Sequence, residues 1–212
     1  MSRIVQLFFL SGVFALLAQT SASDRGIFTD ETGIGAAAGG SVAFDKAKGE
    51  YRVAGGGADV WGTADDFHFV WKKLSGDLTF SADVRFEGPG AFPRRKAMLM
   101  VRQSLDAGSA YVDAASHGNG LTSLQFRGKP GEQTYQIATQ IEGPVRMRIV
   151  RAGNRFTVFA GKVGAEPTRI GSIDPITLGD SIYVGMGVCS HVAGTLETAV
   201  FSNVTIEQTA KQ

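Results

Sequence analysis

Short runs in which apolar and polar residues alternate one by one dominate this sequence, and they restrict most of the chain to β-structure. The clearest run is Leu78–Phe86, where the even positions are apolar and the odd positions hold Thr, Ser, Asp and Arg. A period of two places successive side chains on opposite faces of a strand. After residue 23, no amphipathic run of helical length occurs. The sequence therefore predicts an all-β fold.

Turn residues separate these runs. Segments 118–120 (GNG) and 152–154 (AGN) are hairpin signals, because Gly and Asn accept positive φ. Further strands are predicted at 41–45, 50–54, 67–72, 96–104, 110–117, 120–127, 135–142, 144–152, 155–161, 169–173, 181–189 and 199–207. Many short strands with turns every ~8–12 residues are typical of an antiparallel jelly-roll β-sandwich. A β-propeller is disfavoured because the sequence has no repeat of blade length.

The first 23 residues have the features of a signal peptide. Arg3 precedes an apolar run at 4–17, and small residues follow at 20–23. The run is shorter than the ~20 apolar residues that a transmembrane helix needs. We therefore expect a secreted or periplasmic protein with no membrane anchor after cleavage. Residues 24–40 are expected to form a leader or an edge strand, and residues 41–208 the sandwich domain.

Charge and cysteine content narrow the functional classes. The formal net charge is +1, and no cluster of Lys and Arg indicates a nucleic-acid partner. Cys189 is the only cysteine, which excludes an intramolecular disulfide. We expect it to be buried in strand 181–189, while a thiol nucleophile assisted by His191 is the alternative. The sequence leaves the oligomeric state open.

Segment 96–127 is the most informative one for function, because it reads as three strands with polar residues on one parity. The candidate ligand-binding residues on this parity are Arg102, Tyr111, Asp113, His117, Gln125 and Arg127. If the strands are neighbours, these side chains form one patch. Arg and Asp can make paired hydrogen bonds to vicinal hydroxyls, and Tyr can stack on a sugar ring. The pattern is equally consistent with the solvated face of a half-exposed sheet.

Other chemistry-bearing residues carry weaker signals. Trp61 lies in an irregular stretch and is either an exposed stacking platform or a core residue, whereas Trp71 is expected in a core. The three histidines lack metal-site spacing, which favours structural or ligand-contacting roles. Glycan hydrolysis would need two positioned carboxylates, and Asp113 alone lies on the proposed face. A lyase could use Tyr111 or His117 with a neutralising Arg or Gln.

Three segments together resemble a known family. Segments 58–86, 96–127 and 183–206 resemble a bacterial branch of the concanavalin A-like lectin/glucanase superfamily, the "regulation of enolase protein"-like domain of unknown function. Segment 144–159 adds the strand–turn–strand of such sandwiches, and the resemblance runs from Ile34 to about Glu207. It implies a jelly-roll sandwich and glycan recognition. The superfamily commonly holds a structural Ca²⁺, and no other cofactor is expected. The carboxylate motif of the glucanases is absent.

We therefore expect a non-catalytic jelly-roll domain that binds carbohydrate or cell-envelope glycan on one sheet face. Arg102, Asp113, His117, Gln125 and Arg127 would hydrogen-bond the ligand, with Tyr111 or Trp61 stacking on it. One alternative is a polysaccharide lyase or hydrolase that uses His117 or Tyr111 as acid or base. Another is a structural or protein-interaction module of the cell envelope, since relatives occur fused to propeller repeats.

Overall fold

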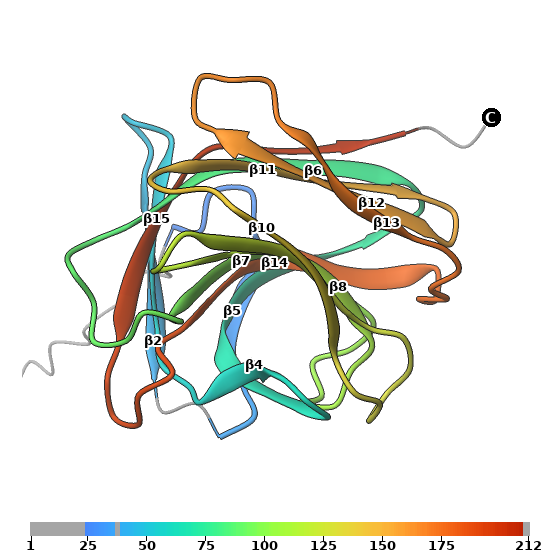
Figure 1. Cartoon of the computed structure of the whole chain (residues 1–212), viewed down its shortest axis with the longest axis horizontal. Coiled ribbons are helices and arrows are strands. Elements are labelled where there is room, and N and C mark those ends of the chain that lie inside the picture. Colours follow the sequence, from blue (N-terminus) through green and yellow to red (C-terminus); the bar gives the residue numbers. More distant parts are fainter. Residues whose placement is uncertain (1–23, 37–38, 210–212) are drawn as a thin grey trace, which may run out of the picture.

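The computed structural model of the protein describes residues 24–36 and 39–209. These residues form two antiparallel β-sheets that lie face to face, one above the other in Figure 1. The predicted all-β jelly-roll sandwich is confirmed. No helix in the described part of the chain is long and apolar enough to cross a membrane. The predicted signal peptide, residues 1–23, lies outside the described residues.

The first sheet has eight strands in the order β1-β5-β14-β7-β8-β9-β10, with β4 paired to β5 off this path. Its strands are β1 (Asp30–Ile34), β4 (Asp59–Trp61), β5 (Ala64–Ser75), β7 (Lys96–Arg102), β8 (Tyr111–His117), β9 (Leu121–Arg127), β10 (Tyr135–Gln140) and β14 (Ser181–Cys189). Strands β7 to β10 follow one another as hairpins. The three strands predicted in segment 96–127 are therefore neighbours.

The second sheet has seven strands in the order β13-β12-β11-β6-β15-β3-β2. Its strands are β2 (Gly40–Asp45), β3 (Glu50–Gly55), β6 (Leu78–Phe86), β11 (Val145–Ala152), β12 (Arg155–Lys162), β13 (Thr168–Ile173) and β15 (Glu197–Gln208). The strands predicted at 78–86 and 181–189 have the observed bounds. Strand β4 was not predicted, because three residues are too few to show an alternating pattern.

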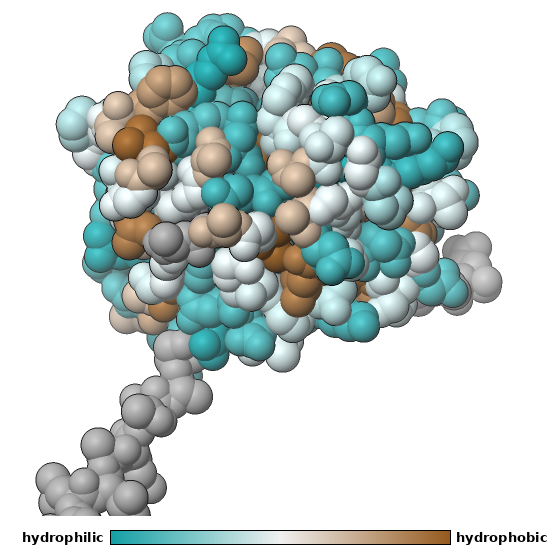
Figure 2. Space-filling model, turned by 90° about the horizontal axis from the view of Figure 1, so that it is seen from below, coloured by the Kyte–Doolittle hydropathy of each residue, from teal (hydrophilic) through white to brown (hydrophobic). Residues whose placement is uncertain are grey.

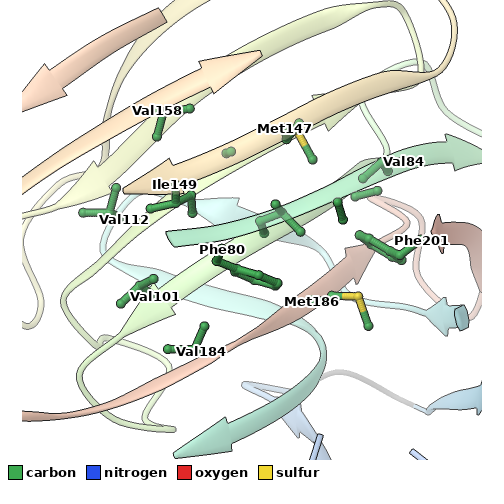
Figure 3. Packing of buried hydrophobic residues seen from close by; sticks show 14 of the residues in the cluster. Phe80, Val84, Val101, Val112, Met147, Ile149, Val158, Val184, Met186 and Phe201 are labelled. Carbon is green, nitrogen blue, oxygen red and sulfur yellow. The ribbon is translucent and has the colours of Figure 1, made fainter. Parts of the chain in front are cut away.

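The main core fills the space between the sheets. Phe80 of β6 and Ile149 of β11 face Val112 of β8 and Val184 of β14 across the sandwich (Figure 3). None of these four side chains is measurably exposed. Burial of one parity of each strand sets the register, because a slip of one residue would turn every apolar side chain to the wrong face.

A second apolar cluster lies on the opposite side of the eight-stranded sheet. We call this side, turned away from the seven-stranded sheet, the outer face. Phe67 and Phe69 of β5 pack there with Met98 and Met100 of β7, and Val60 of β4 closes the cluster. Figure 1 places β4 on this side of the sheet. Every residue of β7 and β8 is therefore buried, on both faces of the sheet.

Candidate functional site

The six polar residues of segment 96–127 lie together on the outer face, where the alternation predicts them. The strand register pairs Arg102 with Tyr111, Tyr111 with Arg127, and Asp113 with Gln125. No member of the set is more than 4% exposed. They form neither an open binding face nor a solvated one, because β4 and two loops cover them.

Arg127 holds these covering segments in place. Its guanidinium donates to both carboxylate oxygens of Asp65, at 2.7 and 3.0 Å. It also donates to five backbone carbonyls, among them those of Gly62 (3.1 Å), Ser109 (3.0 Å) and Glu132 (3.1 Å). These carbonyls belong to three different segments, 59–65, 103–109 and 128–134. The buried arginine thus ties three covering segments to the sheet.

Arg102 and Tyr111 extend the same cluster. Arg102 donates to the carbonyls of Ser104 (2.7 Å) and Asp106 (2.6 Å), and its Nη2 lies 3.4 Å from Asp65. Burial lowers the pKa of Arg102 to about 10, so the guanidinium stays charged at neutral pH. The Tyr111 hydroxyl lies 3.2 Å from the Thr134 hydroxyl, and burial raises the pKa of Tyr111 well above its usual range. Both residues are internal in this fold.

Asp113 occupies the centre of the outer face and is fully buried. Neither of its carboxylate oxygens has a hydrogen-bond partner among the described residues. Burial raises the pKa of Asp113 well above its ordinary value of 3.8, although the charge of Lys96 opposes this shift. An uncompensated buried carboxylate is so costly that the group takes up a proton instead. The Asp113 carboxyl therefore keeps its proton to a higher pH than an exposed aspartate does.

At one end of the outer face, the polar row reaches the surface in a cleft of about 110 Å³, which we call the Trp61 cleft. It is lined by Asp59, Trp61, Arg94, Lys96, His117, Leu121, Gln125, Gln136 and His191. Three of these residues, Trp61, His117 and Gln125, were predicted as ligand contacts from the sequence. Figure 2 shows the side of the molecule that carries β4, where hydrophilic residues predominate and apolar ones form small separate patches.

Lys96 and Trp61 shape the floor and rim of the cleft. The buried Lys96 ammonium donates to Asp59 and to the carbonyl of Val60, both at 2.7 Å, and lies 3.4 Å from the Gln125 amide oxygen. It also lies 5.5 Å from the centre of the Trp61 ring. This cation–π contact and the bonds to β4 hold the indole in place. Trp61 as a whole residue remains 38% exposed.

Two imidazoles complete the cleft. His117 Nδ1 lies 2.9 Å from the carbonyl of Leu121, so this nitrogen carries the proton and Nε2 keeps its lone pair. Burial and the charge of Lys96 lower the pKa of His117 to about 4. His191 Nε2 lies 3.2 Å from Asp59 but is not aligned for a hydrogen bond. Burial lowers the pKa of His191 as well, so both rings are neutral at neutral pH.

The structure also bears on the predicted roles of Cys189 and on a possible metal site. Cys189 is buried, its thiol lies 3.3 Å from the carbonyl of Gly57, and burial raises its pKa to about 12. A thiol with this pKa is not a nucleophile at neutral pH. In residues 24–36 and 39–209, no group of three or more His, Cys, Asp or Glu side chains could hold a metal ion. The structural Ca²⁺ stays a prediction from the family resemblance.

Sequence reasoning missed several residues of the cleft. Lys96 has the same parity as Met98, Met100 and Arg102, so the alternation of the sequence already placed its side chain on the outer face. Asp59 lies on the three-residue strand β4, which shows no pattern. Arg94, Gln136 and His191 belong to a loop, an edge strand and a turn, and only the folded chain brings them together.

Comparisons with known proteins agree with the fold. No protein-family model and no curated protein matches the sequence. Among solved structures, a functionally unknown protein from Saccharomyces cerevisiae is similar, with a TM-score of 0.63 and 16% identity over 81% of this chain and 93% of that one. The carbohydrate-binding module CBM66 from Bacillus subtilis is also similar, with a TM-score of 0.55 and 17% identity over 86% of this chain and 98% of that one.

A family 7 alginate lyase, A1-II', crystallised as a substrate complex of a variant, is also similar. Its TM-score is 0.55, and its identity is 10% over 81% of this chain and 82% of that one. At such low identities, the likeness shows a shared sandwich fold and nothing about the site.

We predict that Asp65→Asn destabilises the fold strongly. The substitution keeps the shape of the side chain but leaves Arg127 and Arg102 without their buried counter-charge, which should lower the free energy of unfolding by about 3–5 kcal/mol. The matched control is Glu166→Gln, which breaks the exposed ion pair with Arg148 and should change it by less than about 1 kcal/mol. Urea unfolding measures both. Equal effects of the two variants would contradict the role assigned to Asp65.

We also predict that Asp113 makes stability depend on pH. The folded chain keeps the Asp113 proton above pH 3.8, where the unfolded chain releases it. The free energy of unfolding should therefore fall as pH rises from there to the folded pKa, by up to about 1.4 kcal/mol per pH unit. Asp113→Asn cannot titrate, so its stability relative to the native chain should increase with pH.

The measurement is urea unfolding of both proteins at about pH 4.5 and about pH 8, a range over which such a linkage appears. Asp180→Asn, which removes an exposed carboxylate, is the control and should follow the native curve. Parallel pH curves for the native chain and Asp113→Asn would show that Asp113 is charged in the folded protein.

Proposed function

We propose that this chain binds carbohydrate in the Trp61 cleft without transforming it. The observation that carries this proposal is the half-exposed indole of Trp61, fixed over Lys96 beside several hydrogen-bonding side chains. An aromatic ring with an exposed face stacks on the apolar face of a sugar ring. The amides of Gln125 and Gln136 can donate hydrogen bonds to its hydroxyls or accept them, and the carboxylate of Asp59 accepts them.

The fold neighbours support the same class of ligand. A carbohydrate-binding module and an alginate lyase share this sandwich. In the proposal, Trp61, His117 and Gln125 contact the sugar. Arg102, Tyr111, Asp113 and Arg127, which the sequence also suggested as contacts, instead form the buried support beneath the cleft. The proposal thus keeps the predicted class of ligand and moves its site to one end of the outer face.

Trp61→Ala should weaken glycan binding by about tenfold or more, equivalent to about 1.4 kcal/mol. The physical reason is the loss of the stacking surface. Tyr135→Ala is the matched control, because Tyr135 is an exposed aromatic residue (59%) that does not line the cleft. Affinity electrophoresis against a panel of polysaccharides provides the measurement. Native-like retardation of Trp61→Ala in every gel would exclude this cleft.

A lyase activity at the same cleft is the second candidate, and the observation that favours it is His117. Its neutral imidazole keeps a lone pair on Nε2, as a general base requires. Release of unsaturated oligosaccharides from a polysaccharide panel, lost in His117→Gln, would support a lyase. A panel that stays intact supports the binding role. A glucanase-type hydrolase is disfavoured because Asp59 is the only carboxylate among the described residues that line the cleft.

The cellular setting is part of the proposal. We infer from the signal-like residues 1–23 that the protein acts in the periplasm or outside the cell. Polysaccharides and envelope glycans are the carbohydrate polymers found there. Assignment to the "regulation of enolase protein"-like branch rests on the sequence resemblance and is consistent with the sandwich fold.

A further inference from the structure

The charges that line the Trp61 cleft are unequal. Two cations, Arg94 and Lys96, face a single carboxylate, Asp59. Lys96 directs its three N–H groups at Asp59, Val60 and Gln125 within the protein. Asp59 is thereby neutralised, and the charge of Arg94 remains. With both imidazoles neutral, the cleft carries an excess positive charge.

Arg94 has no hydrogen bond and no ion pair with any residue that the structure describes, and it is exposed. Its position is nevertheless well defined. The backbone N–H of Arg95 donates to the carbonyl of Phe92 at 3.1 Å, which closes a tight turn with Pro93 and Arg94 at its centre. Proline favours the first central position of such a turn. The turn presents the Arg94 side chain at the mouth of the cleft.

Arg95 anchors this turn to the sandwich. Its guanidinium is buried and donates to Glu197 of β15 at 2.6 Å and to the carbonyl of Gly88 at 2.8 Å. It also lies 4.4 Å from the centre of the Phe86 ring. Two adjacent arginines therefore differ in role: Arg95 fixes the loop, and Arg94 is left available. The backbone that carries Arg94 is therefore anchored, and its guanidinium is available to pair with an anion.

We propose that the sugar bound in the Trp61 cleft is acidic and that its carboxylate pairs with Arg94. This inference rests on the proposed carbohydrate-binding function and names the class of ligand. The planar guanidinium offers two parallel N–H groups that match the two oxygens of a uronate carboxylate. The Trp61 ring receives the face of the same sugar, and the Gln136 amide at the rim can donate to it.

The pKa values of the two histidines reflect the charges that surround the cleft. Besides burial, the charge of Lys96 lowers the pKa of both His117 and His191, and the charge of Arg94 also lowers that of His191. Asp59 opposes these effects, and at His191 its charge has a larger influence than that of Lys96 or of Arg94. Both imidazoles are thus uncharged at neutral pH, and they add no charge of their own to that of Arg94.

The test uses the purified mature chain and two polyuronates, polygalacturonate and polymannuronate, each beside its carboxyl-reduced counterpart. Carboxyl reduction removes the charge and keeps the linkage. We expect at least one polyuronate to bind about tenfold or more tightly than its reduced form, with a preference that shrinks as salt screens the charge. Arg94→Gln should abolish this preference. Arg169→Gln, which removes an exposed charge on β13, is the control and should preserve it.

The outcomes separate this inference from the proposed function. Equal or tighter binding of the reduced polymers, or a preference that survives in Arg94→Gln, would overturn the acidic-sugar assignment. Carbohydrate binding that depends on Trp61 would then still stand. Dextran sulfate is the charge-only probe, and binding as tight as that of the polyuronates would overturn the recognition of a carboxylate. Absence of binding to any neutral or acidic glycan would overturn both proposals.

Discussion

The buried ion pair between Arg127 and Asp65 is the interaction on which the outer face of the sandwich depends. An antiparallel sheet normally buries one face and leaves the other to water. Here Arg127 reaches from β9 to Asp65 of β5 and to carbonyls of three covering segments. A guanidinium has five N–H donors in a fixed plane, so one side chain can satisfy several otherwise buried acceptors. The result is a second core on the outer face.

This second core determines where a ligand can bind. It closes the central part of the outer face, where Arg102, Tyr111 and Asp113 are inaccessible. The cover ends at β4, and Lys96 secures the end of that strand through Asp59 and the carbonyl of Val60. The exposed ring of Trp61 therefore stands at the boundary between the sealed part of the face and the open cleft.

Neighbouring residues in the sequence acquire different roles through this arrangement. Arg95 is buried against Glu197, whereas Arg94 projects beside the cleft. His117 lies at the open end of β8, while the Asp113 carboxyl on the same strand is buried and has no hydrogen-bond partner in the described part of the chain. The polar side chains of segment 96–127 thus form one continuous row, but only those at one end of this row line the open cleft. Carbohydrate recognition, as we propose it, uses only the accessible end.

The alternating pattern of the sequence by itself determined the strands, the sandwich class and the face on which each polar residue lies. These properties follow from the period of two, which is local. The accessibility of those residues was decided by the tertiary structure. Segments 59–65, 103–109 and 128–134 lack any periodic pattern, and they meet over the sheet through Arg127, Asp65 and direct backbone hydrogen bonds, such as that from Thr134 to the carbonyl of Gly62. Their positions depend on contacts between residues as far apart as Gly62 and Arg127, which no local pattern encodes.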